Sequence, residues 1–206
     1  MAITRDTTLD WMLRFAAEMS EHRQELAALD TAIGDGDHGT NMERGMRKAL
    51  EKLDHAQPID PGAVLSTVAM ALISNVGGAA GPLYGTLLLQ MGNAMSGMSE
   101  VDLVGFADAW RNGLEGVQAR GKAQSGDKTM IDALIPAIEA LQEASDLDDG
   151  LRDAVQGAEQ GMKATIPLIA RKGRASYLGE RSRDHQDPGA TSTYYLFKSA
   201  AVALAS

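Results

Sequence analysis

Residues 99–117 read SEVDLVGFADAWRNGLEGV, and they show the pattern that organises the whole chain. Apolar side chains recur there every three or four positions, which is the spacing of one face of an α-helix. The residues on this face are Val104, Ala107, Trp110, Leu114 and Val117. Ser99 and Asp102 precede most of them at the spacing of a capping box, so we expect the helix to begin there. The stretch predicts an amphipathic helix with one buried face.

The same helical spacing recurs in seven other segments on both sides of this stretch. Their predicted bounds are 7–29, 41–53, 61–73, 83–95, 134–141, 151–166 and 189–204. Thr7 with Asp10 forms a further capping-box pattern, and Asp60 and Asp187 each stand before a proline that fits the first helical position. No long alternation of period two competes with these signals. We therefore predict one all-α domain over residues 1–206, with eight helices and almost no sheet.

Composition and charge exclude several classes of function. The 206 residues include no cysteine, which excludes a disulfide scaffold, a thiolate zinc site and an iron–sulfur cluster. The 28 acidic residues outnumber the 19 basic ones and give a net charge of −9, so we expect neither nucleic acid nor a membrane as a partner. No run of about 20 apolar residues is present, and residues 1–10 lack the apolar core of a signal peptide. We therefore expect a cytoplasmic protein.

Four connections between the predicted helices are rich in glycine and charge, and they share one position in the expected bundle. They are residues 30–40, 76–85, 121–129 and 171–189, which follow the first, third, fifth and seventh predicted helices. If successive helices run up and down, all four loops lie at the same end. The order of the segments therefore predicts a functional rim at one end of the bundle.

The first of these loops carries three aspartates, Asp30, Asp35 and Asp37. Three carboxylates in eight positions repel one another unless water or a cation neutralises them. An EF-hand is excluded, because Gly39 stands where a further oxygen ligand belongs and Met46 where the closing glutamate belongs. Magnesium fits better, since it takes a few carboxylates and completes its shell with water and phosphate oxygens. The alternative is a solvated acidic turn that also caps a helix.

The second and third loops carry backbone signals. Residues 76–85, VGGAAGPLYG, place glycines directly before a helix, where free N–H groups bind anions; a tight turn between two helices is the alternative. Residues 121–129, GKAQSGDKT, come close to a phosphate-binding P-loop, but Asp127 interrupts the pattern just before Lys128 and no strand precedes it. The P-loop interpretation therefore fails. A flexible, solvated loop remains, in which Asp127 or Thr129 caps the next helix.

The fourth loop, residues 171–189, is locally basic and longer than an inert connection. Arg174 and Arg181 are candidate phosphate ligands, because a guanidinium pairs with a phosphate through two hydrogen bonds. We interpret the loop as a lid or binding loop; a surface loop whose arginines face water is the alternative. His38 and His185 lie in the rim loops, where each could contact a nucleotide or hydrogen-bond a turn.

Taken together, these loops resemble a known family. The motifs are IGDGDHG at 33–39 with Asp30 upstream, VGGAAGPLYG at 76–85, GDKTM at 126–130, RKGRASYLGERS at 171–182 and HQDPGATS at 185–192. In this order they resemble the nucleotide-binding L subunit of bacterial dihydroxyacetone kinases over nearly the whole chain. The resemblance implies an eight-helix antiparallel up-and-down barrel that holds ADP or ATP and two magnesium ions at one end. Lys128 and Arg181 match motif positions, but the resemblance gives neither of them a contact.

The resemblance also implies the roles of individual residues. Asp30, Asp35 and Asp37 would bind both magnesium ions and, with Arg174 near the phosphates, would serve phosphoryl transfer. The nucleotide would contact or border the following residues: His38, Gly39, Thr40, Asn41, Ala79, Ala80, Gly121, Met130, Arg174, Asp187, Pro188 and Gly189. The charges are consistent with this arrangement. ADP carries about −3, the three aspartates together carry about −3, and two magnesium ions supply about +4, which leaves a negative charge that an arginine offsets.

Two protein partners are implied as well. In the family, dihydroxyacetone is held covalently by a histidine of a separate K subunit, against which the L subunit docks its rim. Separate L subunits usually keep ADP as a coenzyme that a phosphohistidine protein of the phosphoenolpyruvate phosphotransferase system rephosphorylates, whereas single-chain relatives exchange ATP from solution. We expect the phosphohistidine donor here, because a chain of 206 residues has no room for a K domain.

Three other functions stay open at this point. The acceptor could be another small ketose such as erythrulose, or a fatty acid, in an ATP-dependent kinase with a related nucleotide site. The chain could instead bind a nucleotide only to signal to a regulator, without catalysis of its own. A bundle that buffers metal ions without a nucleotide is the third alternative. The oligomeric state is open as well, a homodimer included.

Overall fold

The structure, a computed structural model, describes residues 2–205 and is helical over most of them. Its α-helices are α1 (Arg5–Glu21), α2 (Arg23–Ile33), α3 (His38–Ala56), α4 (Pro61–Asn75), α5 (Ala80–Ala94), α6 (Leu103–Gly121), α7 (Met130–Glu143), α8 (Leu147–Ala164) and α9 (Pro188–Leu204). A 3-10 helix, η1 (Arg174–Ser182), precedes α9, and β1 (Ile3–Thr4) pairs with β2 (Glu100–Val101). No helix within residues 2–205 is long and apolar enough to cross a lipid bilayer.

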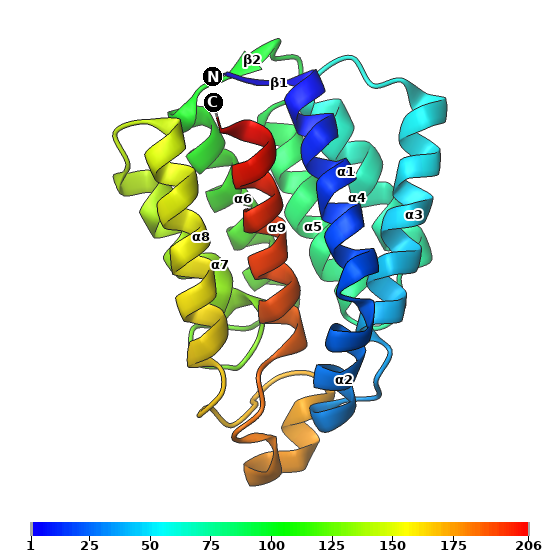
Figure 1. Cartoon of the computed structure of the whole chain (residues 1–206), viewed down its shortest axis with the longest axis vertical. Helices are drawn as coiled ribbons and strands as arrows, with labels where there is room; N and C mark the ends of the chain where they lie inside the picture. The colour runs from blue at the N-terminus through cyan, green and yellow to red at the C-terminus, as the bar shows by residue number, and fades with distance from the viewer. Residues whose placement is uncertain (1, 206) are drawn as a thin grey trace.

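Eight of these helices form a closed ring. Each packs on the next in the order α1, α3, α4, α5, α6, α7, α8 and α9, and α9 packs on α1 again. Figure 1 shows the eight helices upright and side by side, with α2 and η1 at the lower end. The ring confirms the predicted all-α up-and-down barrel, and α2 is a helix outside it.

The predicted first helix, residues 7–29, is wrong in one respect, because the structure divides it into α1 and α2. α1 ends at Glu21 and α2 begins at Arg23, and His22 between them has φ −93° and ψ 12°. Buried Met19 and Leu26 keep a helical spacing across the break, so the periodicity did not reveal it. The break allows α2 to leave the ring and to pack against α3 and η1 at the lower end.

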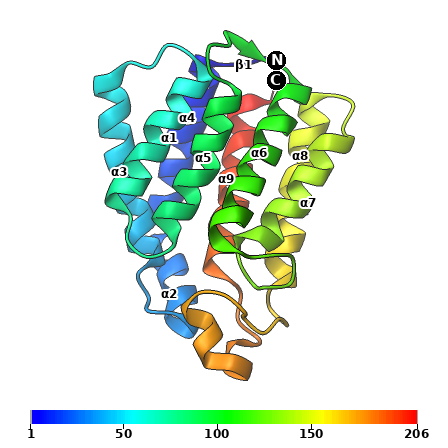
Figure 2. The same ribbon diagram turned by 180° about the vertical axis from the view of Figure 1, so that it is seen from behind.

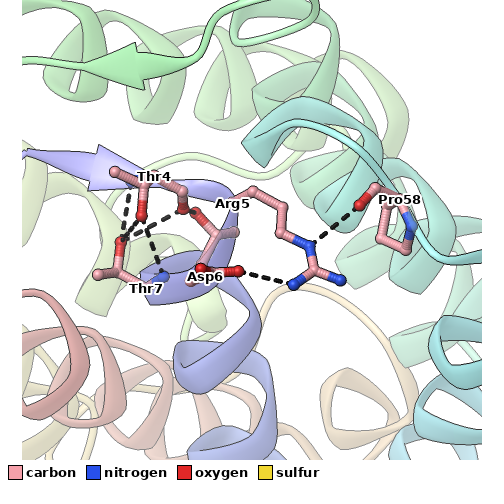
Figure 3. Close-up of polar contacts among 6 residues, drawn as sticks. Thr4, Arg5, Asp6, Thr7 and Pro58 are labelled. Atoms are coloured by element: carbon pink, nitrogen blue, oxygen red, sulfur yellow. Dashed lines mark hydrogen bonds and ion pairs between the residues drawn. The ribbon is translucent and has the colours of Figure 1, made fainter.

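The amino-terminal segment closes the opposite end of the barrel. Thr4 caps α1 and forms a capping box with Thr7, so the predicted cap at Thr7 is wrong by three residues (Figure 3). Arg5 Nε donates a hydrogen bond to the Pro58 carbonyl oxygen at 3.1 Å, which ties α1 to the connection between α3 and α4. The antiparallel pair β1–β2 lies at this end, away from α2 (Figure 2).

The start of α6 also differs from the prediction. Asp102 rather than Ser99 caps the helix, because the residues between them pair with β1 as β2. Val104, expected on the buried face, is 68% exposed in the first turn of α6. Ile73 and Ile166, the last residues of the predicted helices 61–73 and 151–166, are exposed at 38% and 36%, and Ile166 lies beyond the end of α8. The other predicted caps are confirmed: Asp60, Thr129 and Asp187.

Large aromatic side chains fill the interior of the ring. Trp110 of α6 stacks on Phe197 of α9 with 4.1 Å between ring centroids, and Trp11 of α1 lies 5.7 Å from Trp110. All three are buried, and the Trp11 indole N–H donates to the Leu196 carbonyl oxygen at 3.0 Å. Burial of a side chain of this size stabilises a fold by about 2 kcal/mol or more. The core therefore holds α1, α6 and α9 together and fixes the ends from which the rim loops emerge.

Candidate functional site

The four glycine- and charge-rich loops meet at one end of the barrel, as predicted, and surround a cavity of about 390 Å³. Each loop contributes to its wall; Asp35, Ala79, Lys128 and Arg174 are one example from each. Figure 1 shows α2 and the orange segment that contains η1 at this end of the ring. A cavity of this volume suits a small-molecule ligand.

Asp30, Asp35 and Asp37 converge at the wall of this cavity. One carboxylate oxygen of each lies within 4.8 Å of the others. Asp30 lies in the last turn of α2, and its Oδ2 accepts hydrogen bonds from the backbone N–H groups of Asp37 at 2.9 Å and His38 at 3.1 Å. These bonds fold the loop back onto α2, and Gly36 turns the chain with a φ of 76°. The cluster offers the carboxylate oxygen donors that Mg²⁺ takes.

Arg174 faces the aspartates from the fourth loop, whose residues 171–184 we call the lid. Its Nη2 lies 3.1 Å from Asp35 Oδ2, and it begins η1 directly after Gly173, which has a φ of 63°. The Arg174 side chain is 66% exposed, so the ion pair itself adds little stability. The guanidinium is nevertheless held where it can pair with an anion beside the aspartates. Arg181, the other predicted phosphate ligand, does not line the cavity.

His38 begins α3 and joins the cavity wall to a chain of hydroxyl groups. Its Nε2 lies 2.9 Å from Ser192 Oγ, which lies 2.7 Å from the Tyr84 hydroxyl. Burial lowers the pKa of His38, although Asp30 and Asp37 act to raise it. The ring is therefore neutral at pH 7, so that one nitrogen donates a hydrogen bond while the other accepts one.

Asp187, Pro188 and Gly189, three of the predicted nucleotide neighbours, stand at the start of α9 and line the cavity. The Asp187 carboxylate caps the helix by accepting a hydrogen bond from the Ala190 backbone N–H at 2.7 Å. Burial raises the pKa of Asp187 to about 7, while this hydrogen bond and the Lys128 ammonium act to lower it. The carboxyl group thus changes its charge near neutral pH.

The rest of the wall consists of backbone and apolar side chains. Ala79 and Ala80 line the cavity at the start of α5, where no side chain caps the first N–H groups. Such a helix start attracts anions. Gly121 at the end of α6 and Met130 at the start of α7 also line it. The prediction missed apolar wall residues that lie within the helices next to the rim loops: Leu83, Val117 and Ile131.

Three predicted nucleotide contacts, Gly39, Thr40 and Asn41, do not line the cavity. Gly39 packs so closely on α2 that a Cβ there would collide with the Arg23 carbonyl oxygen. Thr40 is exposed, and Asn41 Oδ1 accepts a hydrogen bond from Arg44 at 2.7 Å. These residues lie in the first turn of α3, where successive side chains point about 100° apart around the axis, so they do not all share the direction of His38.

Similar proteins place the chain in a family. The DAK2 domain model matches residues 32–202. The chain is 41% identical to the PEP-dependent dihydroxyacetone kinase, ADP-binding subunit DhaL, of Escherichia coli over 98% of this chain and 99% of that relative. It is 43% identical to the corresponding subunit of the PEP-dependent dihydroxyacetone kinase 1 of Listeria innocua over 96% of both.

A solved structure is similar as well. The dihydroxyacetone kinase from C. freundii in complex with AMP-PNP and Mg²⁺ matches with a TM-score of 0.74 and 25% identity, over 98% of this chain and 34% of that chain. The similar part of that longer protein therefore corresponds to the whole helical barrel described above. Because the family model covers most of the sequence and two relatives match it nearly from end to end, the chain belongs to the DAK2 domain family.

Proposed function

We propose that this chain is the nucleotide-binding subunit of a dihydroxyacetone kinase. In this role it holds ADP or ATP at the rim and transfers a phosphoryl group to dihydroxyacetone held on a separate K subunit. The observation that carries the proposal is the meeting of three carboxylates and Arg174 at the wall of one cavity. Relatives named as ADP-binding subunits, and a similar structure that contains AMP-PNP and Mg²⁺, support the choice of ligand.

Asp30, Asp35 and Asp37 would hold two magnesium ions beside the nucleotide phosphates. Magnesium bound there would neutralise the charge that develops on the phosphoryl oxygens during transfer. The charge count supports two ions: ADP and the carboxylates together carry about −6, so that with Arg174 one ion leaves about −3 and two leave about −1. A site with little residual charge suits a cavity that is partly closed to water.

The composition of the cavity wall fits the two halves of a nucleotide. Leu83, Val117 and Ile131 offer apolar surface for the flat base, whereas the aspartates and Arg174 offer charge for the phosphates. Because His38 is neutral, it can donate or accept a hydrogen bond without adding charge. The other proposed nucleotide neighbours that line this cavity are Ala79, Ala80, Gly121, Met130, Asp187, Pro188 and Gly189. Gly39, Thr40 and Asn41 lie next to His38 in the first turn of α3 without lining the cavity, and they complete the set of proposed contacts.

The proposal includes two protein partners and a mode of use for the nucleotide. The K subunit supplies the acceptor, and a phosphohistidine protein rephosphorylates ADP while it stays bound. The names of the relatives, which are subunits of PEP-dependent kinases, support this scheme. Native mass spectrometry of gently purified protein tests it. Retained ADP and magnesium are the expected result, whereas an empty site that fills rapidly from ATP in solution would contradict the coenzyme mode.

Replacement of single aspartates tests the site itself. Asp35→Asn and Asp37→Asn each remove one negative ligand with little change in shape, so Mg·ADP affinity and dihydroxyacetone phosphorylation should each fall by about a hundredfold or more. Affinity is measured by titration calorimetry, and phosphorylation in a mixture with the K subunit and the phosphoryl donor. Asp54→Asn, at an exposed carboxylate near the end of α3, is the matched control and should change neither value. Full activity of the Asp35 and Asp37 variants would refute the proposal.

A further inference from the structure

Lys128 is a buried lysine whose ammonium group is surrounded by backbone carbonyl oxygens. Only 1% of the residue is exposed to solvent. The Nζ atom donates to the carbonyl oxygens of Thr165 at 2.7 Å, Leu168 at 3.1 Å and Ile166 at 3.3 Å, and to that of His185. An ammonium has three hydrogens, so four acceptors saturate it and two of them share one hydrogen. Lys128 thus makes a complete set of charge-assisted hydrogen bonds to main chain alone.

The four carbonyl groups belong to the two segments that flank the lid. Thr165, Ile166 and Leu168 precede residues 171–184, and His185 follows them. The Asp184 backbone N–H also donates to the Ile166 carbonyl oxygen at 2.9 Å, directly beside the ammonium. The lid is therefore a loop whose two ends meet, and Lys128 lies at the point where they meet.

The converging carbonyl oxygens make a donor necessary at this position, and Lys128 has two further unusual features. Its backbone φ is 63°, a left-handed conformation that residues other than glycine rarely adopt. Burial lowers the pKa of Lys128, and the carboxylates of Asp187, Asp184 and Asp132 act to raise it. An apolar residue at 128 would leave converging carbonyl oxygens without a donor, which is costly in a buried site.

We propose that Lys128 is a positioning residue: its ammonium fastens both ends of the lid and so holds Arg174 at the aspartate cluster. Within the lid, Arg174 Nη2 lies 3.1 Å from Asp35 Oδ2, and this contact is the one that the fastened lid maintains. The consequence for catalysis rests on the proposed function, in which Arg174 pairs with the nucleotide phosphates. The fastening of the lid does not rest on it, so the two can be tested separately.

Limited trypsin digestion of the full chain without nucleotide tests the fastening. The lid carries exposed cleavage sites at Arg171, Arg174, Arg181 and Arg183. In Lys128→Met we expect cleavage within the lid to accelerate about tenfold or more, because the open state of the lid becomes more populated. Lys122→Met is the matched control: Lys122 lies in the same loop and also has a positive φ, 53°, but is exposed, and it should match the wild type. Equal lid cleavage in Lys128→Met and wild type would overturn the proposal.

A graded series protects this test against a variant that does not fold. Lys128→Gln retains an N–H₂ donor that can reach some of the carbonyl oxygens, so its lid should be cleaved at a rate between those of wild type and Lys128→Met. Circular dichroism shows whether each variant keeps its helices. If only Lys128→Gln folds, faster cleavage than wild type supports the proposal and an unchanged rate overturns it.

A double-mutant cycle with Arg174→Ala tests the positioning of the guanidinium. If Lys128 acts through Arg174, the loss of Mg·ADP affinity caused by Arg174→Ala in wild type should shrink about threefold or more in the Lys128→Met background. A residue that only stabilises the fold would give independent losses, and that outcome would overturn the positioning role. If wild-type protein binds no Mg·ADP, the proposed function fails, while the digestion experiment still decides whether Lys128 fastens the lid.

Discussion

Removal of the Tyr84 hydroxyl should loosen the start of α9 by a calculable amount. In Tyr84→Phe the ring remains in place and only the buried hydroxyl is lost. This oxygen lies 2.7 Å from Ser192 Oγ and 3.0 Å from Thr193 Oγ1, and it donates to the Gly189 carbonyl oxygen at 3.2 Å. Burial raises the pKa of Tyr84 well above its usual value, so the group is a neutral phenol throughout the ordinary pH range.

The expected cost follows from the partners that stay satisfied. Ser192 Oγ still bonds to the Pro188 carbonyl oxygen at 3.1 Å, and Thr193 Oγ1 still bonds to the Gly189 carbonyl oxygen at 2.9 Å. No buried donor is therefore orphaned, and the loss is that of one or two net hydrogen bonds, about 1.5 kcal/mol in the free energy of unfolding. For a chain of this size that corresponds to a fall in Tm of about 3 to 6 °C.

Thermal unfolding followed by circular dichroism measures this change, and a second tyrosine, Tyr194, supplies the control. Tyr194 is partly buried on α9, the helix that carries Ser192 and Thr193, and its hydroxyl bonds to none of residues 2–205, so Tyr194→Phe should shift Tm by less than about 2 °C. The Ser192 hydroxyl also contacts His38 at the cavity wall, so Tyr84→Phe should weaken Mg·ADP binding as well. Equal shifts in Tm for the two variants would refute the reasoning.

The cap of α9 and the contact between α7 and α8 give two further expected outcomes. Burial raises the pKa of Asp187 from 3.8 to about 7, so the folded state binds this proton more tightly than the unfolded chain does. The resulting stabilisation is complete below about pH 4 and is lost as the pH rises through about 7. Asp187→Asn keeps a capping side chain and should reduce this loss, measured as urea stability at about pH 5 and about pH 8; an unchanged pH dependence would contradict the assignment. Gly161→Ala brings a Cβ against the Asp132 carbonyl oxygen and should cost about 2 kcal/mol of unfolding free energy, whereas Gly77→Ala meets only ordinary contacts and should cost less than about 0.5 kcal/mol. Similar urea midpoints for the two glycine variants would show that the close helix approach is not needed.

The features that could be predicted from the sequence are those that a short segment of residues determines by itself. The helices of the ring carry their own periodicity, and the caps at Asp60 and Asp187 stand beside the prolines that identify them. The aspartate cluster was predictable for the same reason, because Asp30 at the end of α2 and Asp35 and Asp37 in the following loop lie within eight consecutive residues, and Gly36 allows the chain to turn back between them. A loop-based site depends mainly on neighbours in sequence, so its ligands can be recognised without knowledge of the fold.

The break between α1 and α2 could not be predicted in this way. The contacts around His22 explain why. Its imidazole lies 2.8 Å from Glu25 Oε2, which is a local contact, but it also stacks on Tyr195 with 4.1 Å between ring centroids. Tyr195 is 173 residues away in sequence, and its hydroxyl donates to the same Glu25 carboxylate at 2.8 Å. The direction in which α2 leaves the ring is thus fixed by α9, which the pattern of residues 7–29 cannot report.

Lys128 shows the same limit within the site. Its surroundings in sequence resemble an interrupted P-loop, and the local interpretation is a solvated lysine. The structure buries it because carbonyl groups 37 to 57 residues further along the chain converge on its ammonium. Those acceptors are main-chain atoms, which every residue possesses, so no side-chain type at positions 165–168 or 185 marks them in the sequence. The residues that would bind the ligand could therefore be identified from their own loop, whereas the residue that fastens the lid becomes recognisable only when the fold brings two distant segments to one point.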